Sequence, residues 1–439
     1  MKGDLGSRDR ALRITGGAQL AGDICVSGSK NAALPEMAAA LLTTERVTLH
    51  NVPRVTDSTV MAEILTELGG QSVGDGTVIL DTGAVVRSDV PDHLGRRMRA
   101  TIVLLGALLA RFGRARVPRP GGDDIGARRV EQHLRGLRQM GAHVSETKDE
   151  IIATADRLSG DRIVFDLPTV TGTENILLAA VTAKGRTEIF NAAREPHVQD
   201  LCRLLVKMGA RIEGVGTERL IVDGISELRG AEHTVIADYL EAGTYAIAVA
   251  AAGGMLRIQC SRPEDLQVLL LKLEQAGAQV EAGDGWFRVS RSQRAPVRPI
   301  DMSTWTFPGF PTDLQAQYMA LMTQADGESV ISEYVHENRF QHVRELAKMG
   351  AGITVEGRLH AIVHGPCRLH GTEVAIPDIR SGAALVIAAL CAEGDSLLRN
   401  AWHVERGYED MVGKLASVGA RIKSVGVESE PPDSNHLYE

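Results

Sequence analysis

The sequence of 439 residues predicts an α/β protein in which six repeated helix-strand units form two pseudo-symmetric domains of three units each. Three observations predict this fold class: an evenly spaced glycine pattern, six alanine-rich apolar helices in phase with it, and a β-rich segment after each of those helices. The chain is also too long for one ordinary hydrophobic core, which favours at least two domains.

The glycine pattern comes first, because a fixed internal period constrains the whole fold. It consists of Leu, three mixed residues and a glycine followed by Ala or Gly, and its six copies lie 68 to 73 residues apart. Such a glycine can take the left-handed conformation that ends an amphipathic helix. Solenoid repeats have periods of about 20–50 residues, so a closed pair of three-unit domains is favoured. The glycines are Gly69, Gly141, Gly209, Gly277, Gly350 and Gly419.

Six alanine-rich segments with few charges recur in phase with these glycines. Because they are apolar on nearly every side, we expect them to form buried helices. A β-rich segment follows each one, so each unit is predicted to run helix, strand, helix, strand, with three buried helices per domain and sheets outside. The segments span residues 33–42, 100–113, 174–185, 242–254, 314–327 and 381–394.

The composition excludes several classes of function. A net charge of −8 argues against a nucleic-acid or anionic-membrane surface, because both need a positive face. The apolar stretches are too short to span a bilayer, and the first twenty residues contain no apolar core of a signal peptide, so we expect a cytoplasmic protein. The five cysteines lack metal-ligand or redox spacing, which predicts scattered reduced thiols and no metal site.

Two charged segments depart from the packing pattern in the first half of the chain. Lys30 and Asn31 stand at the start of the first alanine-rich helix, where the helix N-terminus and the lysine would together attract an anion. Asp123 and Asp124 follow a Gly-Gly pair in the loop 117–128. The plainer interpretations are an exposed lysine and a solvated loop.

Further charged residues lie beside predicted element boundaries in the second half. Asp313 begins the fifth alanine-rich helix, and Arg339, Arg380 and Arg406 follow it along the chain. Guanidinium groups suit carboxylate and phosphate oxygens, so three of them favour a converging anion site. The plainer interpretation of Asp313 is a helix N-cap.

Five motifs occur in order along nearly the whole chain, from about residue 14 to residue 426. They are SGSKNAALP from residue 27, PGGDDIGAR from 120, FPTDLQAQ from 310, ENRFQHV from 337 and ERGYE from 405. Together they resemble the UDP-N-acetylglucosamine 1-carboxyvinyltransferase family of enolpyruvyl transferases. The sister enzyme of aromatic amino acid synthesis shares the six-unit fold but has Ser and Arg near its lysine, whereas Asn-Ala-Ala follows Lys30 here.

The resemblance implies the enolpyruvyl transferase fold, a two-domain inside-out α/β barrel with the active site in the cleft between the domains. One domain would comprise residues 1–29 plus 238–439, and the other residues 30–237. The implied enzyme transfers the enolpyruvyl group of phosphoenolpyruvate to the 3-hydroxyl of UDP-N-acetylglucosamine and releases phosphate. This step belongs to peptidoglycan precursor synthesis, and so to cell-wall biogenesis, cell shape and cell division. Neither a cofactor nor a metal is implied.

The resemblance also implies an acid and a base. Asp123 matches the position where most members carry a cysteine that is taken to protonate the substrate, and where a minority carry aspartate. We therefore expect Asp123 to deliver the proton, the glycine-rich loop to act as a lid, and fosfomycin, which alkylates the family cysteine, to leave the protein active. Asp313 resembles the group near the sugar hydroxyl, as a base or an orienting group.

The remaining implied roles concern substrate binding. Lys30, Arg128 and Arg406 resemble the residues that hold phosphate. Arg339 and Arg380 resemble those that face the carboxylate, and Asn31 contacts the same region. The uridine nucleotide is expected at Arg99, Arg128, Arg129, Val130, Glu131, Gln132, Pro168 to Thr171 and Val335.

Departures from the family cluster at the nucleotide end. Arg129 stands where the family usually has proline, Glu131 where it has aspartate, and His336 where it often has an aromatic residue. The donor is therefore better supported than the acceptor. Two alternatives follow: an enolpyruvyl transferase acting on another uridine nucleotide in a specialised pathway, or a non-catalytic paralogue that binds UDP-sugars.

Overall fold

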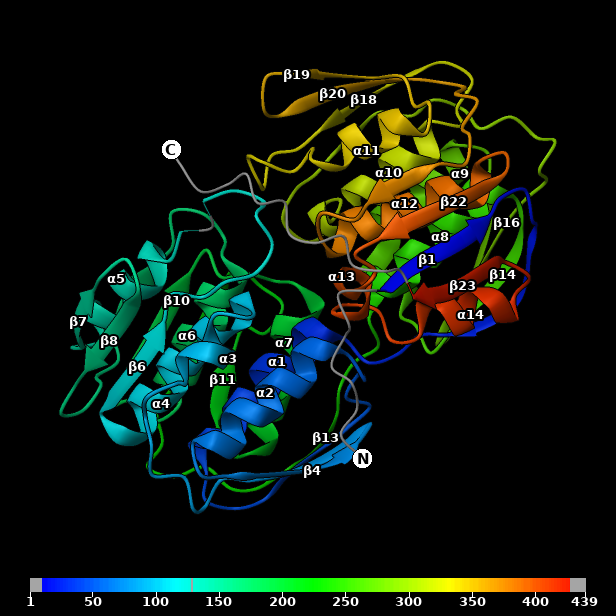
Figure 1. The fold of residues 1–439 in the computed structure, drawn as a ribbon. Coiled ribbons are helices and arrows are strands. Elements are labelled where there is room, and N and C mark those ends of the chain that lie inside the picture. The colour runs from blue at the N-terminus through cyan, green and yellow to red at the C-terminus, as the bar shows by residue number, and fades with distance from the viewer. Residues whose placement is uncertain (1–9, 128, 427–439) are drawn as a thin grey trace, which may run out of the picture.

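The computed structural model describes residues 10–127 and 129–426, so Arg128 lies outside the described residues. Figure 1 shows two lobes. Lobe I has a hydrophobic core built from residues 12–26 and 239–422, and lobe II has a separate core built from residues 32–235. These cores support the predicted domain boundaries near residues 30 and 238, which stay a prediction. No helix in the described part of the chain is long and apolar enough to cross a membrane.

Within the residues that the structure describes, each lobe contains three buried alanine-rich helices, as the alanine-rich segments predict. Their side chains are almost all buried, and α10 packs against both α8 and α12 while α4 packs against α1 and α6. Small side chains permit this close approach. In lobe II the helices are α1 (Lys30–Ala39), α4 (Leu104–Phe112) and α6 (Val170–Ala180). In lobe I they are α8 (Tyr239–Ala252), α10 (Gln315–Met322) and α12 (Ile379–Cys391).

The amphipathic helices end as the glycine pattern predicts. Each of the six repeat glycines has a positive φ, between 94° and 110°, the region that glycine adopts without steric cost. The helices are α2 (Thr56–Glu67), α5 (Glu131–Gln139), α7 (Pro196–Lys207), α9 (Gln267–Gln275), α11 (His342–Lys348) and α14 (Met411–Ser417).

The predicted order helix, strand, helix, strand omits strands that the structure contains. The unit around α6 runs β9 (Arg162–Val164), α6, β10 (Arg186–Phe190), α7, β11 (Arg211–Glu213) and β12 (Arg219–Asp223). Its sheet has the order β11-β12-β10-β9, with β9 parallel to β10 and the other pairs antiparallel. The missed strands are short and largely exposed, so they carry little apolar periodicity.

The other sheets of lobe II follow a similar plan. One has the order β13 (Glu232–Thr234), β3 (Val47–His50), β5 (Thr77–Asp81) and β4 (Gln71–Asp75). The other has three strands, β6 (Arg114–Pro118), β8 (Glu150–Thr154) and β7 (His143–Glu146).

Lobe I has three four-stranded sheets, and its elements match the predicted fold class. The first sheet is β15 (Gln279–Gly283), β16 (Trp286–Arg291), β14 (Gly254–Gln259) and β2 (Leu20–Cys25). The second is β17 (Met302–Ser303), β18 (Glu328–Ser332), β20 (His360–His364) and β19 (Ile353–Glu356). The third is β21 (Glu373–Ala375), β22 (Asp395–Arg399), β1 (Arg10–Thr15) and β23 (Arg421–Gly426). Short helices are α3 (Asp92–Gly95), α13 (Trp402–Glu405), η1 (Ala40–Leu42), η2 (Arg99–Val103), η3 (Pro263–Leu266) and η4 (Thr312–Leu314).

The chain crosses between the lobes twice, and the two crossing segments lie side by side. The N–H of Ser29 donates to the carbonyl of Ile236 at 2.7 Å, and the N–H of Asp238 donates to the carbonyl of Ser27 at 2.9 Å. The strands that lead into these segments exchange partners. β2 precedes α1 but pairs in parallel with β14, whereas β13 precedes α8 but pairs in parallel with β3.

This exchange explains why the prediction of reduced thiols is wrong for one pair. Cys25 ends β2 beside the end of β14 and forms a disulfide with Cys260, although the two are 235 residues apart. Cys260 has φ 57°, and Asn51, which follows β3, has φ 58°. The Asn51 amide donates to the carbonyl of Val235 at 2.9 Å. This hydrogen bond links the ends of β3 and β13, as the disulfide links the ends of β2 and β14.

Candidate active site

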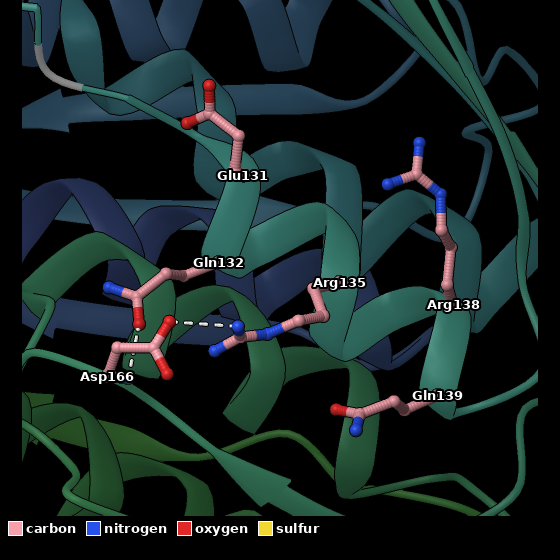
Figure 2. Close-up of a pocket in the computed structure, with 6 residues that line it drawn as sticks. All are labelled: Glu131, Gln132, Arg135, Arg138, Gln139 and Asp166. Atoms are coloured by element: carbon pink, nitrogen blue, oxygen red, sulfur yellow. Dashed lines mark hydrogen bonds and ion pairs between the residues drawn. The ribbon is translucent and has the colours of Figure 1, made fainter.

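A surface pocket of about 520 Å³ lies along one face of α5 (Figure 2). The Gln132 side chain accepts a hydrogen bond from the N–H of Asp166 at 2.7 Å and donates to the carbonyl of Leu167 at 3.1 Å. Arg135 forms an ion pair with Asp166 at 2.8 Å. The start of α5 is thereby tied to the segment that leads to Pro168–Thr171. The lining residues are Glu131, Gln132, Arg135, Arg138, Gln139 and Asp166.

The structure places Arg129, Val130 and Arg99 close to this pocket or to α5 and places Val335 elsewhere. Arg129 is exposed just before α5, and Val130 is buried. Arg99 begins η2, and its charge acts on His133 of α5. Burial first and then Arg99 lower the pKa of His133 to about 3, so this imidazole is neutral. Val335 is not among the residues that line the pocket, and sequence reasoning missed the pocket's Arg135 and Arg138.

A second group, the cross-lobe cluster, consists of Lys30, Asp57, Asp123 and Arg406. The Lys30 ammonium lies 3.3 Å from one oxygen of Asp57, and Arg406 Nε lies 3.1 Å from the other. Arg406 also donates to Asp123 at 2.8 Å. Lys30 begins α1 in lobe II with Asn31 beside it, whereas Arg406 follows α13 in lobe I.

Charge balance keeps the buried arginine of this cluster ionised. Burial alone would lower the pKa of Arg406, but the carboxylates of Asp57 and Asp123 outweigh that effect and raise it. Sequence reasoning missed Asp57, because a single acid in the first turn of a helix is common and favourable for the helix itself. Its role depends on Arg406, which lies 349 residues away.

The loop that carries Asp123 is docked on lobe I. The N–H of Ala127 donates to the Glu337 carboxylate at 2.8 Å, and the Gln341 amide donates to the carbonyl of Asp124 at 2.6 Å. A Cβ at Gly126, where φ is 134°, would lie 2.6 Å from Glu337. The glycine therefore permits this close contact. The loop is thus in contact with lobe I, and its action as a lid stays a prediction; its Arg128 lies outside the described residues.

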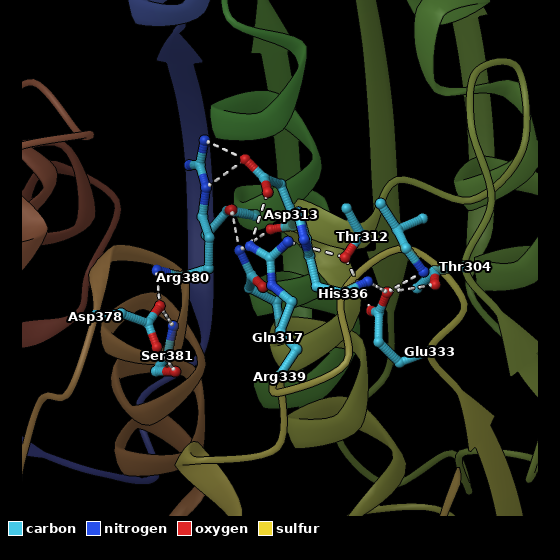
Figure 3. Close-up of polar contacts among 12 residues, drawn as sticks. Thr304, Thr312, Asp313, Gln317, Glu333, His336, Arg339, Asp378, Arg380 and Ser381 are labelled. Atoms are coloured by element: carbon cyan, nitrogen blue, oxygen red, sulfur yellow. Dashed lines mark hydrogen bonds and ion pairs between the residues drawn. The ribbon is translucent and has the colours of Figure 1, made fainter. Parts of the chain in front are cut away.

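A third group, the arginine-pair cluster, consists of Asp313, Arg339 and Arg380 (Figure 3). Arg339 lies 2.7 Å from one oxygen of Asp313, and Arg380 lies 3.0 Å from the other. Burial alone would raise the pKa of Asp313, but the charges of Arg380 and Arg339 hold it far below its usual range. Asp313 lies inside η4, which is capped by Pro311, so it is not the N-cap of the helix.

Hydrogen bonds position this cluster from both sides. Arg339 donates to the Thr312 hydroxyl at 2.8 Å, and the same hydroxyl donates to the buried Glu333 carboxylate at 2.8 Å. Glu333 also accepts from the N–H groups of Val335 and His336, which brings Val335 close to this cluster. The guanidinium of the buried Arg380 also lies over the Tyr408 ring, 5.3 Å from its centroid, so Tyr408 helps to fix its orientation.

Asp238 connects the two ionic clusters. Its carboxylate caps α8 by accepting from the N–H groups of Leu240 and Glu241. Burial raises the pKa of Asp238, while the charges of Arg380 and Lys30 act in the opposite direction. One cation from each cluster, Lys30 and Arg380, therefore acts on the same buried carboxylate.

Comparison with known proteins assigns the chain to a family. The family model of EPSP synthase (3-phosphoshikimate 1-carboxyvinyltransferase) matches residues 14–415. The chain belongs to the EPSP synthase family. The crystal structure of the enolpyruvyl transferase NikO from Streptomyces tendae is similar, with a TM-score of 0.85 and 29% identity over 95% of this chain and 99% of that one.

Two structures of EPSP synthase from Acinetobacter baumannii share the fold. Their TM-scores are 0.72 and 0.71, each at 17% identity, over 95% and 94% of this chain and 99% of each of theirs. The predicted fold class and the enolpyruvyl transferase class of enzyme are thus confirmed. The family matches leave the acceptor open.

Proposed function

We propose that this enolpyruvyl transferase moves the enolpyruvyl group of phosphoenolpyruvate to a hydroxyl of a uridine nucleotide in a specialised pathway. The observation that carries the proposal is the presence of two cation clusters, Lys30 with Arg406 and Arg339 with Arg380. One cation of each acts on the buried Asp238, and each cluster suits one anionic group of the donor. For the acceptor, support comes from the similarity to NikO and from Arg129, Glu131 and His336, which depart from the UDP-N-acetylglucosamine enzymes at the nucleotide end.

Phosphoenolpyruvate carries a phosphate and a carboxylate, and the two clusters offer a place for each. Lys30 and Arg406 suit the phosphate, helped by the N-terminus of α1 and by the Ser29 hydroxyl, which is buried with no hydrogen-bond partner in the described residues. Arg339 and Arg380 suit the carboxylate, because guanidinium groups bind carboxylates in bidentate fashion. Donor binding then competes with the carboxylates of Asp123 and Asp313 for the same arginines.

The two displaced carboxyl groups supply the acid and the base. Asp123 donates its proton to the methylene carbon of phosphoenolpyruvate, which makes the neighbouring carbon cationic. The acceptor hydroxyl oxygen bonds to that carbon while Asp313 takes the hydroxyl proton. The pKa of Asp313 rises from its depressed value when the carboxylate of the donor binds Arg339 and Arg380 in its place. The Asp123 carboxylate then takes a proton back from the new methyl group as the carbon–oxygen bond to phosphate breaks, which restores the double bond, and the proton held by Asp313 leaves with the phosphate.

The acceptor is assigned to the α5 pocket and its surroundings. Arg135 and Arg138 supply cationic donors, and the Gln132 and Gln139 amides supply neutral ones. UDP-N-acetylglucosamine remains the second candidate, because the motif around Lys30 and Asn31 resembles that family. Retention of Lys30, Asp123, Asp313 and Arg406 argues against a non-catalytic paralogue.

Phosphate release tests the proposal. The protein is incubated with phosphoenolpyruvate and one candidate acceptor in each of five separate reactions, and the products are identified by mass spectrometry. The acceptors are uridine, UMP, UDP, UDP-N-acetylglucosamine and shikimate 3-phosphate. We expect phosphate release and an enolpyruvyl adduct with a uridine nucleotide that lacks the amino sugar. Turnover with UDP-N-acetylglucosamine alone would select the second candidate, and turnover with shikimate 3-phosphate alone would contradict both.

A further inference from the structure

A buried polar cluster in lobe II lies outside the active site and outside every motif of the sequence. Glu36 of α1 is 0% exposed, Asp200 of α7 is 1% exposed and His233 of β13 is 5% exposed. His233 Nε2 lies 3.3 Å from Asp200 Oδ1 and 3.7 Å from Glu36 Oε1. Three elements that are far apart in sequence thus bring one potential ligand atom each within 4.8 Å of the others.

The cluster is poor in hydrogen-bond donors. By distance and angle, no hydrogen bond among the described residues reaches either oxygen of Glu36 or either ring nitrogen of His233. Burial and the neighbouring Asp200 carboxylate raise the pKa of Glu36, so a proton shared between Glu36 and Asp200 is the competing occupant of this cluster. Asp200 accepts from the N–H of Ile236 at 2.9 Å and from Arg203 at 3.4 Å. A buried carboxylate without a donor is costly, because nothing replaces the water it has lost. A cation at the centre would remove that cost.

The geometry also fits a metal ion. Ligand bonds to Zn²⁺ of about 2.0–2.2 Å in a tetrahedral arrangement place neighbouring ligand atoms about 3.3–3.6 Å apart, close to the two distances seen here. One imidazole and two carboxylates form a mixed nitrogen and oxygen set that suits first-row divalent transition metals.

We propose that Glu36, Asp200 and His233 form a structural site for a divalent transition-metal ion of the zinc class. The ion joins α1, α7 and β13, of which α7 and β13 are also tied by the Lys207 ammonium, which donates to the carbonyl of Glu232 at 3.2 Å. The ion does not contact the active-site residues. It does hold α1 in place, and α1 begins with Lys30. Asp200 also holds Ile236, whose carbonyl accepts from Ser29, so the site fixes the crossing segments as well.

The test uses the full chain, stripped with a chelator and then titrated with ZnCl₂. We expect one equivalent to bind tightly, and the melting temperature to rise by about 2–4 °C at a hundredfold excess of free Zn²⁺ over Kd. Glu36→Gln and His233→Gln are each expected to weaken Zn²⁺ binding at least about tenfold and to lose the rise. His50→Gln is the control, since His50 lies on the neighbouring β3 and contacts Glu232; it should bind and shift as the parent does.

Two results would overturn the proposal. One is a parent protein that binds no Zn²⁺, together with a Glu36→Gln variant as stable as the parent, which indicates a Glu36 proton shared with Asp200. The other is Zn²⁺ binding that both cluster variants retain, which places the ion elsewhere. If the variants fail to fold, crystals of the parent grown with ZnCl₂ decide: an anomalous peak between the three side chains supports the site, and peaks only at other positions refute it.

Discussion

Asp313 and Asp123 are both carboxylates held by arginine, but their arginines come from different parts of the molecule. Arg339 and Arg380 belong to the same lobe as Asp313, and both contact it directly. Arg406 reaches Asp123 from the opposite lobe, and the loop that carries Asp123 rests on residues 337–341 of that lobe. The comparison teaches that the proposed base is fixed within one lobe, whereas the proposed acid is in place only when the lobes and the loop meet.

The largest effect is expected from removing the acid. Asp123→Asn keeps the shape of the side chain but removes the transferable proton, so we expect phosphate release to fall about 10²–10⁴-fold while calorimetry shows unchanged nucleotide binding. Asp124→Asn is the matched control, because Asp124 is held on lobe I through its backbone carbonyl, which accepts from Asn338 and Gln341. Turnover near the parent level in Asp123→Asn would remove Asp123 from the mechanism. Fosfomycin is expected to cause no time-dependent inactivation of the parent.

The next effect tests the fixed cluster. Arg380→Lys retains the charge but loses the guanidinium fork, so we expect the KM for phosphoenolpyruvate to rise about 10-fold to 10²-fold, with little change in the KM for the acceptor. Steady-state kinetics with each substrate varied measures both. Arg368→Lys serves as the control, since Arg368 is exposed and forms an ion pair with Glu393 at the surface. A KM for phosphoenolpyruvate equal to the parent value would contradict the carboxylate assignment.

A smaller effect is expected from disturbing the loop that brings Asp123 to Arg406. Gly126→Ala introduces a Cβ against Glu337 at a positive φ, which disfavours the docked loop, and we expect turnover to fall about tenfold. The melting temperature should change little, because the loop lies at the surface. Gly357→Ala offers a control with φ 64° and nothing within 4 Å of the added Cβ. Equal activities of the two variants would show that docking of the loop is unimportant.

The smallest effect belongs to the α5 pocket. Arg138→Ala removes a partly exposed guanidinium, so the KM for the acceptor should rise only about two- to fivefold, with kcat and the KM for phosphoenolpyruvate unchanged. Arg162→Ala is the control, because Arg162 is exposed in the same lobe and does not line the pocket. A change confined to the KM for phosphoenolpyruvate would show that the pocket does not bind the acceptor.

Local chemistry made much of the fold predictable from sequence. The six repeat glycines signal helix ends because the left-handed conformation is a property of the residue itself, and the alanine-rich segments signal burial because their apolar character is visible within a dozen residues. The three-residue strands β9 and β11 have too few positions to show alternation, and they were missed.

Long-range contacts account for the parts of the site that sequence could not give. Asp57 is an ordinary first-turn acid until Arg406 is placed beside it, and Cys25 finds Cys260 only because β2 and β14 become neighbours. Glu36 lies in a helix that is alanine-rich in sequence, where nothing predicts Asp200 and His233 on either side. The residues of the motifs, by contrast, were found because they recur as short local strings.

The paired crossing segments constrain how substrates can enter. Since Ser27–Ser29 and Ile236–Asp238 are hydrogen-bonded to each other, the two linkers must bend together and provide a single axis of rotation. Sliding of one lobe past the other would break those bonds, so we expect opening to be a swing about that axis, with the 121–127 loop at the moving edge. The same geometry makes lobe II an insertion in the chain of lobe I. Because the two ends of the insertion meet, the hydrophobic core of lobe I stays continuous.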